Sequence, residues 1–585
     1  LALFSTLQVL VPTGSRVERC FFSFSVMASL AFVATPHRPS WTSPVRSTTS
    51  TKSLANGFGD ASRGFLALGV VTLAFTRRTV GRAAYGGYGG YGGNRMSAQE
   101  QAERTEMKRQ REAAQFFGYQ KRLMQTGVRQ PDENQWHLQE KRLFGSSHVV
   151  AGINFAKYDD IEVTTEGGTG REQPIKTFQE ACERYDLPQE LTDNLNRCGY
   201  NIPTPVQKYS IPAVLEGSDV MVTAQTGSGK TAAFLVPIIT AALQAGAKEL
   251  KEGAVCPSCV ILAPTRELCQ QITQEAKRLT FRSPARVQAI YGGEEAVGQL
   301  RNIAAGIEIV VCAPGRLDDF LQRGVISMEE VKFLVLDEAD RMLDMGFEPQ
   351  IRNIIETYNM PEPGEGGRQT MMFSATFPQD MQDMALDFLD PAYYGISVGQ
   401  VGHAATDVEQ YFEQVDWSSK FDRLCDLLNE VSEDNGAPKK TIVFANTKNM
   451  VDDITQQLRD RGIRSASMHG GTVQNSRNRA LADVKSGRIS VLVATDVAAR
   501  GLDVPGIEHI VNFDLPNDGE TYVHRIGRTG RIGNKGRATS FVGNRENSLR
   551  SIVNAMREAK KDDPEASDVP DWLQDMAYSG GRGRR

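Results

Sequence analysis

The sequence predicts an α/β protein with two tandem domains, each built on a parallel β-sheet covered by helices. The first observation is an alternation of short β-rich runs with helical stretches from about residue 176, including "DVMVTA", "CVILAP" and "FLVLDEAD". Such alternation is typical of βαβ units. The second is a restart of this pattern, with "KTIVFAN" and "SVLVATD", after a polar stretch near residues 399–408. The third is length, because 585 residues suffice for two to four domains.

The predicted segments follow one another in a simple order. A low-acid leader with a Tyr/Gly-rich linker comes first, then an N-terminal extension, the two domains and a C-terminal tail. Their predicted bounds are 1–97, 98–175, 176–398, 409–562 and 563–585. Residues 97–125 are charged and helix-prone without a clear apolar stripe, which predicts a solvated or partly ordered extension.

The leader differs in composition from the rest of the chain. It carries ten Lys/Arg but only two acidic residues, so its charge is +8 and the remaining residues carry −13 of a net −5. Met27 opens a Ser/Thr/Arg-rich stretch typical of an organelle transit peptide. The apolar run Phe65–Phe75 is too short to span a bilayer and is interpreted as a second targeting element. We therefore expect a plastid or mitochondrial address; a disordered leader on a cytoplasmic protein is the alternative.

Two short segments and one cysteine pair each leave two interpretations open. "YGGYGGYGG", Tyr85–Gly93, is expected to be a flexible linker, with weak tyrosine stacking on RNA as the alternative. The tail "GGRGRR", Gly580–Arg585, either contacts phosphates non-specifically or is a plain disordered end. Cys256 and Cys259 form a CxxC without a second ligand pair, so a loop Cys before a buried strand Cys is favoured over half of a zinc site.

A phosphate-binding loop is predicted where "AQTGSGKT" lies between a strand and a helical run. Glycines allow backbone N–H groups to face phosphates, and the following helix N-terminus adds its positive dipole end. Lys230 would pair with the β- and γ-phosphates, and Thr231 would offer its hydroxyl to Mg²⁺. The predicted loop consists of Ala224, Gln225, Thr226, Gly227, Ser228, Gly229, Lys230 and Thr231.

The second half of a nucleotide site is predicted at "VLDEAD", Val335–Asp340. A hydrophobic strand that ends in Asp337 supplies the carboxylate that holds Mg²⁺. Glu338 is placed to orient and deprotonate the attacking water. Together the two motifs predict an NTPase, without saying which kind.

Further motifs carry a resemblance to a known family. Asp337–Asp340 spells D-E-A-D. It is preceded by "PTREL" and followed by "SAT", "ARGLD" and "HRIGRTGR", within about residues 176–560. The chain resembles a DEAD-box RNA helicase, which implies two RecA-like domains, ATP hydrolysis and RNA binding. The strings "RMLDMGFEPQI", "INFAKYDDI" and "VPDWLQDMA" are similar to the Vasa-like branch.

The resemblance implies roles for matching residues in the ATP site. Gln207 would hydrogen-bond adenine, Tyr200 would lie against the ring, and Phe178 is the upstream aromatic. Asp503 would meet the ribose. Arg528 and Arg531 would reach the γ-phosphate from the second domain, with His524 linking them to Glu338. Ser374 and Thr376 would couple ATP hydrolysis to the action on RNA.

RNA contacts are implied in both domains, through groups suited to sugar and phosphate rather than base edges. The resemblance assigns them to Arg266, Gly293, Gly315, Arg316, Gln474, Arg477 and Thr495. RNA binding would therefore be largely independent of base sequence, and 2′-OH contacts would favour RNA over DNA. The acidic body argues against a broad basic DNA-coating surface.

Three positions depart from the family pattern. Ala313 replaces a Thr before Pro314 and so removes a hydroxyl from the predicted RNA face. Gly471 stands where an Asp is usual, and no basic residue precedes Pro203. A DNA helicase of the same build and an ATP-dependent RNA clamp that seldom unwinds are the rival functions. No oligomer or protein partner is implied, so we expect a monomeric core.

Overall fold

The structure is a computed structural model of the 585-residue chain. It describes residues 97–145, 161–225, 227–364, 366–399, 408–432, 438–499, 504, 506–530, 535–544, 546–562 and 566–579. All of them belong to Gly93–Arg585, one of the two units into which the chain divides. The predicted leader, the linker, the arginine tail and most of "INFAKYDDI" lie outside the described residues.

Two helices, α1 (Ala98–Thr126) and α2 (Glu133–Phe144), form the N-terminal extension. Each begins with a capping box, at Ser97 and at Asp132. The first turns of α1 are exposed, but Phe116 in its second half is only 2% exposed and packs in the core of the first domain. Glu112 of α1 also pairs with Arg323, both nearly buried. These contacts are among several apolar and charged contacts that dock the extension on the first domain, including the Arg109–Asp319 ion pair and the Trp136–Phe281 ring contact.

The first domain contains the following helices and strands in chain order. They are β1 (Val163–Gly167), α3 (Phe178–Arg184), α4 (Gln189–Cys198), α5 (Pro205–Leu215), β2 (Val220–Ala224), α6 (Lys230–Gln244), β3 (Cys259–Leu262), α7 (Arg266–Leu279), β4 (Val287–Ile290), α8 (Ala296–Ile303), β5 (Ile309–Cys312), α9 (Pro314–Gln322), β6 (Phe333–Asp337), α10 (Ala339–Asp344), α11 (Glu348–Thr357), β7 (Gln369–Ser374), α12 (Gln379–Phe388) and β8 (Tyr394–Val398).

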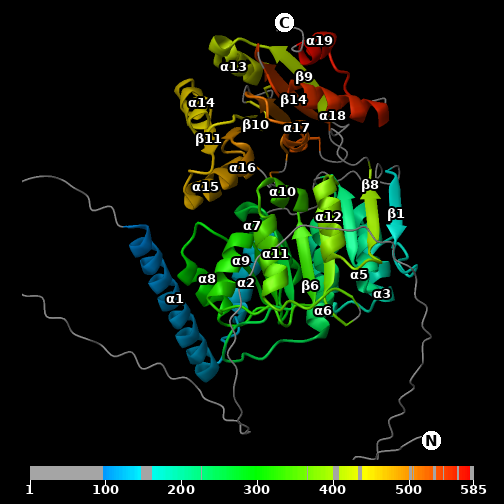
Figure 1. Ribbon diagram of the computed structural model, residues 1–585, viewed down its shortest axis with the longest axis vertical. Helices are drawn as coiled ribbons and strands as arrows, with labels where there is room; N and C mark the ends of the chain where they lie inside the picture. The colour runs from blue at the N-terminus through cyan, green and yellow to red at the C-terminus, as the bar shows by residue number, and fades with distance from the viewer. Residues whose placement is uncertain are drawn as a thin grey trace, which may run out of the picture. The chain divides into compact units, whose positions relative to one another are not determined.

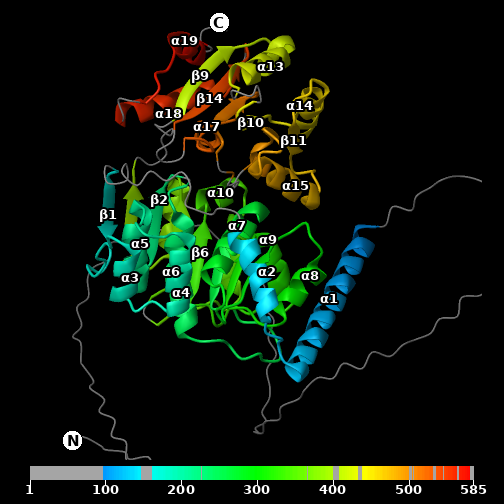
Figure 2. The same ribbon diagram turned by 180° about the vertical axis from the view of Figure 1, so that it is seen from behind.

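These strands form one sheet in the order β1-β8-β2-β7-β6-β3-β5-β4. Neighbouring strands are parallel except for β1, which pairs antiparallel with β8 at the edge. Helices α3 to α7 cover one face and α8 to α12 the other (Figure 1; Figure 2). Strands β3 and β5 are continuous apolar runs and fully buried, as expected of a parallel sheet covered on both faces.

The second domain contains a further set of helices and strands. They are β9 (Val408–Gln414), the 3₁₀-helix η2 (Trp417–Ser419), α13 (Lys420–Glu430), β10 (Thr441–Phe444), α14 (Lys448–Asp460), β11 (Ser465–Met468), α15 (Gln474–Lys485), β12 (Val491–Ala494), α16 (Asp496–Ala499), β13 (His509–Asn512), α17 (Gly519–Ile526), β14 (Gly536–Val542), α18 (Leu549–Asp562) and α19 (Asp571–Ser579).

Its strands form an all-parallel sheet in the order β11-β12-β10-β13-β14-β9. Helices α13 and α14 pack on one face and α15 to α19 on the other. The predicted pair of parallel-sheet α/β domains is confirmed. In the part of the chain that the structure describes, no helix is long and apolar enough to cross a membrane.

Candidate functional site

The predicted phosphate loop joins the end of β2 to the start of α6. Gly227 and Gly229 have φ values of 85° and 87°, in the left-handed region that favours glycine. A Cβ on Gly229 would also lie 2.5 Å from the side-chain nitrogen of Gln207. No side chain caps α6, so the first N–H groups of this helix remain available for an anion. Thr226 lies outside the described residues.

Lys230, the first residue of α6, is held at the centre of this loop. Its Nζ donates to the backbone oxygens of Ala224, at 2.7 Å, and Ser374, at 3.0 Å. Burial lowers the pKa of Lys230, while the carboxylates of Asp337, Asp340 and Glu338 oppose that shift. The ammonium is therefore preoriented and faces three carboxylates, which suits a group that binds a polyphosphate with its metal ion. Thr231 follows it and is half-buried.

Asp337 ends strand β6 near Lys230, and Glu338 follows it as the residue before helix α10. Burial raises the pKa of Asp337 to about 7, the neighbouring Glu338 carboxylate adds to the rise, and Lys230 opposes it. Glu338 adopts φ 52°, a strained conformation for a residue with a side chain. Its Oε2 is buried and accepts no hydrogen bond from the described residues. A strained residue with an unsatisfied carboxylate oxygen is suited to accept a hydrogen bond from a bound molecule.

The predicted adenine residues lie beside the same loop. Gln207 donates from Nε2 to the Gly229 backbone oxygen at 3.0 Å and accepts from the Thr204 N–H at 3.0 Å. Its amide thus supports the phosphate loop and keeps one hydrogen and one lone pair for a ligand. The ring of Phe178 is buried and lies 5.2 Å from that of Tyr200, which donates its hydroxyl to Glu275.

A hydroxyl of the "SAT" motif lies between two carboxyl groups from different domains. Thr376 Oγ1 is 3.0 Å from Asp340 Oδ2 and 2.7 Å from Glu520 Oε1. Asp340 also accepts the backbone N–H groups of Ala375 and Thr376. Burial raises the pKa of Glu520. His524, one helical turn further along α17, has Nε2 3.9 Å from Asp340.

Sequence reasoning missed the role of Glu520. The signal that points to it is the spacing of Glu520 and His524, four residues apart and therefore on one face of a helix. Ligand atoms of Asp340, Glu520 and His524 all lie within 4.8 Å of one another. Asp340 of the D-E-A-D motif in the first domain thus lies close to His524 of "HRIGRTGR" in the second.

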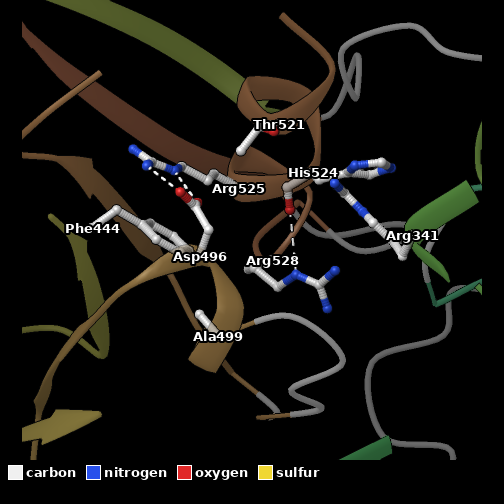
Figure 3. A pocket seen from close by; sticks show the side chains of 8 residues that line it. All are labelled: Arg341, Phe444, Asp496, Ala499, Thr521, His524, Arg525 and Arg528. Carbon is white, nitrogen blue, oxygen red and sulfur yellow. Dashed lines mark hydrogen bonds and ion pairs between the residues drawn. The ribbon is translucent and has the colours of Figure 1, made fainter. Parts of the chain in front are cut away.

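The arginines of "HRIGRTGR" have different surroundings. Arg525 is 2% exposed and makes a bidentate ion pair with Asp496. Arg528 donates from Nε to the His524 backbone oxygen, and Figure 3 shows its guanidinium directed away from the Arg525–Asp496 pair. Arg525 therefore acts in packing the second domain, whereas Arg528 remains a candidate for phosphate binding. Arg531 and Asp503 lie outside the described residues.

Several predicted RNA residues meet around Glu267. Arg266 donates to Gln474 at 3.3 Å, and Arg477 pairs with Glu267 at 3.0 Å, so the network joins both domains. The Arg266 guanidinium covers Gly293, where a Cβ would lie 2.0 Å from it. Gly293 also has a φ of 83°, in the left-handed region that favours glycine, so a side chain here would strain the backbone and displace the guanidinium.

Other predicted RNA residues lie apart from this network. Arg316 donates to the Glu294 backbone oxygen at 3.1 Å. A Cβ on Gly315 would meet no atom within 4 Å, which leaves room for a ligand. Thr495 is half-buried and directly follows strand β12.

Cys256 and Cys259 are arranged as a loop cysteine followed by a buried strand cysteine. Cys259 is buried in β3, and Cys256 lies in the preceding loop, with Sγ 3.7 Å from the Ala254 backbone oxygen. Among the described residues, neither cysteine belongs to a group of three potential metal ligands.

Two family models match the chain in the regions of these motifs. The model described as "DEAD/DEAH box helicase" matches residues 204–384. The model described as "Helicase conserved C-terminal domain" matches residues 419–533.

Solved structures resemble the chain as well. Dbp5 of S. cerevisiae bound to RNA and ADP BeF3 is 26% identical, with a TM-score of 0.55, and the match covers 69% of this chain and 100% of that one. A variant of S. cerevisiae Dbp5 with the same ligands is 27% identical, with a TM-score of 0.56. That match covers 69% of this chain and 97% of the Dbp5 chain. The RNA helicase Prp28 of Chaetomium thermophilum bound to ADP is 31% identical, with a TM-score of 0.36, 77% and 98% covered. With two family models that together match half of its residues, the chain belongs to the DEAD-box family of ATP-dependent RNA helicases.

Proposed function

We propose that ATP is hydrolysed at a site shared by the two domains and that RNA drives them together. The observation that carries this proposal is the bridge from Thr376 and Asp340 in the first domain to Glu520 and His524 in the second. Lys230, Asp337 and Glu338 belong to one domain and Arg528 to the other, so neither domain holds a complete set. ATP and RNA then favour each other's binding, as linkage requires.

The site fits Mg²⁺, which prefers oxygen ligands and works with one or two carboxylates and substrate phosphates. Thr231 and Asp337 would hold the ion, partly through water. The pKa of Asp337 is raised because its carboxyl is buried next to the Glu338 carboxylate. When bound, the ion neutralises charge on the β- and γ-phosphates. Lys230 binds the same phosphates, and the free N–H groups of α6 orient them.

The proposed base is Glu338. Its unsatisfied Oε2 accepts a proton from the attacking water, which is thereby oriented toward the γ-phosphorus. Arg528, with Arg531, stabilises the charge that develops on the transferred phosphoryl group. Gln207, Tyr200 and Phe178 surround the adenine, and Asp503 meets the ribose.

The RNA path is proposed to run along Arg266, Gly293, Gly315 and Arg316 and across to Gln474, Arg477 and Thr495. Support comes from the Arg266–Gln474 bond, which places parts of both halves side by side. Guanidinium and amide groups bind phosphate and sugar without reading bases. A closed clamp on one strand would expel its partner, so short duplexes are separated locally. The two Dbp5 structures, which contain RNA and a nucleotide analogue, support the same arrangement here.

We also place the protein in the Vasa-like branch, as a monomeric enzyme. Two of the three strings that suggest this branch fall in described residues, in α10 to α11 and in α19, where Leu573 is fully buried. The organelle address of residues 27–95 is a separate proposal that rests on composition. Fusing this segment to a fluorescent protein and sequencing the mature N-terminus tests it, and a diffuse cytosolic, uncleaved fusion would overturn it.

Arg528→Ala tests the shared site. RNA-stimulated turnover should fall by up to ~10³-fold, because the arginine acts on transition-state charge, while ATP binding is retained. The matched control is Arg488→Ala, a surface arginine paired with Asp483. An Arg528→Ala enzyme that turns over as fast as the control would show that the domains do not share one site.

A further inference from the structure

The second sheet repeats the strand order of the first. When the strands are numbered from β2 to β7 in one domain and from β9 to β14 in the other, both sheets run 1-6-5-2-4-3. Strand β9 therefore corresponds to β2, which leads to the phosphate loop, and β13 corresponds to β6, which ends in Asp337. The helices that follow these two strands also correspond, because α6 begins with Lys230 and α13 begins with Lys420.

A cavity of about 440 Å³ lies at this corresponding position in the second domain. Its lining comes from the loop after β9 and from the ends of β10, β13 and β14, the carboxyl edge where open α/β sheets bind ligands. The lining residues include Asp416, Trp417, Lys420, Asp514 and Glu546. The cavity is separate from the phosphate loop, whose residues do not line it.

The lining differs from a phosphate site in its charge. Lys420 donates from Nζ to the Phe513 backbone oxygen at 2.9 Å and pairs with Asp514 at 3.3 Å, so its charge is neutralised. Asp416 occupies the loop itself, and no glycine lies between Val415 and Lys420. Three carboxylates thus face one paired ammonium. An anion would be repelled, and a cation would be attracted.

An exposed tryptophan adds a surface for a planar cation. Trp417 is 65% exposed at the rim of the cavity, unusual for so large a ring. The Lys420 ammonium lies 5.3 Å from the centre of this ring, so a second cation would use the exposed remainder of the ring. A guanidinium stacks on tryptophan and binds carboxylates through two parallel hydrogen bonds. The combination of Trp417 with Asp416 and Glu546 matches an arginine side chain better than a lysine.

The chain carries arginines within reach of this cavity. Helix α19 ends at Ser579, and the Tyr578 ring lies 5.5 Å from the guanidinium of Arg550. Arg550 is in the first turn of α18, four residues after Glu546. Six residues, Gly580–Arg585, continue from α19, and six residues extend at most about 20 Å. Three of the six are arginines and the other three are glycines.

We propose that the arginine tail Gly580–Arg585 docks in this acidic cavity, at the place that corresponds to the ATP site of the first domain. Asp416 and Glu546 bind the guanidinium groups, and Trp417 stacks on one of them. The tail is thereby an intramolecular ligand of the second domain. RNA is the competing ligand for the tail, because arginines also bind phosphate.

Hydrogen exchange tests the docking in the full chain. We compare the intact protein with a chain that ends at Ser579, following peptides that cover residues 415–420 and 543–547. A docked tail should slow exchange there about fivefold, since it closes loops that otherwise open locally. Replacing Arg582, Arg584 and Arg585 by Ala should abolish the protection, whereas strand β10 should exchange equally in both chains.

Pocket variants of the full chain give the reciprocal test. Glu546→Gln and Trp417→Ala should each remove the difference between intact and shortened chains. The matched control is Trp572→Ala, another partly exposed tryptophan outside the cavity. Equal exchange in the intact and shortened chains would overturn the proposal. So would a shortened chain that loses RNA affinity while residues 415–420 exchange as before, which would assign the tail to RNA.

Discussion

At the scale of single residues, Glu338 has a strained backbone and an unsatisfied carboxylate oxygen. It combines φ 52° with a buried, unsatisfied Oε2, two features that cost free energy in the absence of ligand. Lys230, Asp337 and Asp340 hold the surrounding site in place, so the strain persists. The proposed role as base follows from this geometry and is testable without changing the shape of the residue.

Glu338→Gln keeps the shape of the side chain and removes the base. ATP and RNA should still bind, and the RNA complex formed with ATP should persist, because hydrolysis no longer ends it. The measurement is the RNA dissociation rate with and without ATP. If ATP does not lengthen the lifetime of the variant's RNA complex, Glu338 does not activate water.

His509 predicts a dependence of stability on pH. It is fully buried in β13, and burial with the nearby Arg537 lowers its pKa from 6.5 to about 3. Below pH 6.5 the unfolded chain binds a proton that the folded chain does not, so stability falls as pH drops from about 6.5 toward 3. At pH 5 the loss is about 2 kcal/mol.

The variant His509→Gln removes this titration and can still donate to Thr539, the present partner of Nε2. Unfolding of the second domain at pH 7.5 and pH 5 should show a smaller acid loss in the variant than in the natural protein. Identical losses in both proteins would contradict a buried neutral histidine.

At the scale of elements, the departure from the family pattern at Ala313 changes the N-terminus of a helix. Thr265 and Thr447 cap α7 and α14 by accepting the N–H of Leu268 and Met450, both at 3.2 Å. Ala313 occupies the same position before α9 and makes no side-chain bond. Helix α9 therefore lacks the side-chain cap that a threonine hydroxyl at position 313 could provide, in addition to the hydroxyl lost from the predicted RNA face.

Ala313→Thr should stabilise the first domain by about 1 kcal/mol, because a threonine N-cap satisfies a free N–H of α9. Thermal unfolding measures the gain, and RNA affinity should change less than about twofold if the hydroxyl is used in the cap. Ala313→Val is the matched control, with a similar shape and no hydroxyl. Equal stability of the two variants would argue against capping.

At the scale of the whole molecule, one hydroxyl lies between carboxyl groups of the two domains. The Thr376 hydroxyl has one hydrogen but lies within 3.0 Å of both Asp340 and Glu520. That one hydrogen can be donated to only one of the two carboxyl groups at a time. Burial raises the pKa of Glu520, and the hydrogen bond with Thr376 opposes that rise.

Glu520→Gln keeps a side chain of the same shape that can hydrogen-bond the Thr376 hydroxyl, so RNA-stimulated ATP turnover should remain near normal. Glu520→Ala removes a buried hydrogen bond worth about 1–2 kcal/mol and should lower RNA-stimulated turnover roughly tenfold. ATP binding without RNA should be unchanged in both variants. Equal turnover of the alanine and glutamine variants would mean that this contact does not help to join the domains.

The sequence by itself determined the two parallel-sheet domains, the strand–loop–helix that contains the predicted phosphate loop, and the DEAD-box family. These follow from local patterns, because apolar strands, glycines at positive φ and a lysine at a helix start occupy adjacent residues. The roles predicted for Thr226, Asp503 and Arg531, which the structure does not describe, stay predictions.

Only the tertiary structure decided which distant side chains meet. Glu520 is 144 residues from Thr376, and Gln207 supports a loop 22 residues away, so no local pattern indicates either contact. The docking of α1 likewise depends on Phe116 meeting a complementary core and on Glu112 meeting Arg323. The matching strand orders of the two sheets, and the cavity at the carboxyl edge of the second, became visible only once the strands were paired. Pairing between strands depends on burial and backbone geometry across the whole domain, which the residues of one strand do not specify.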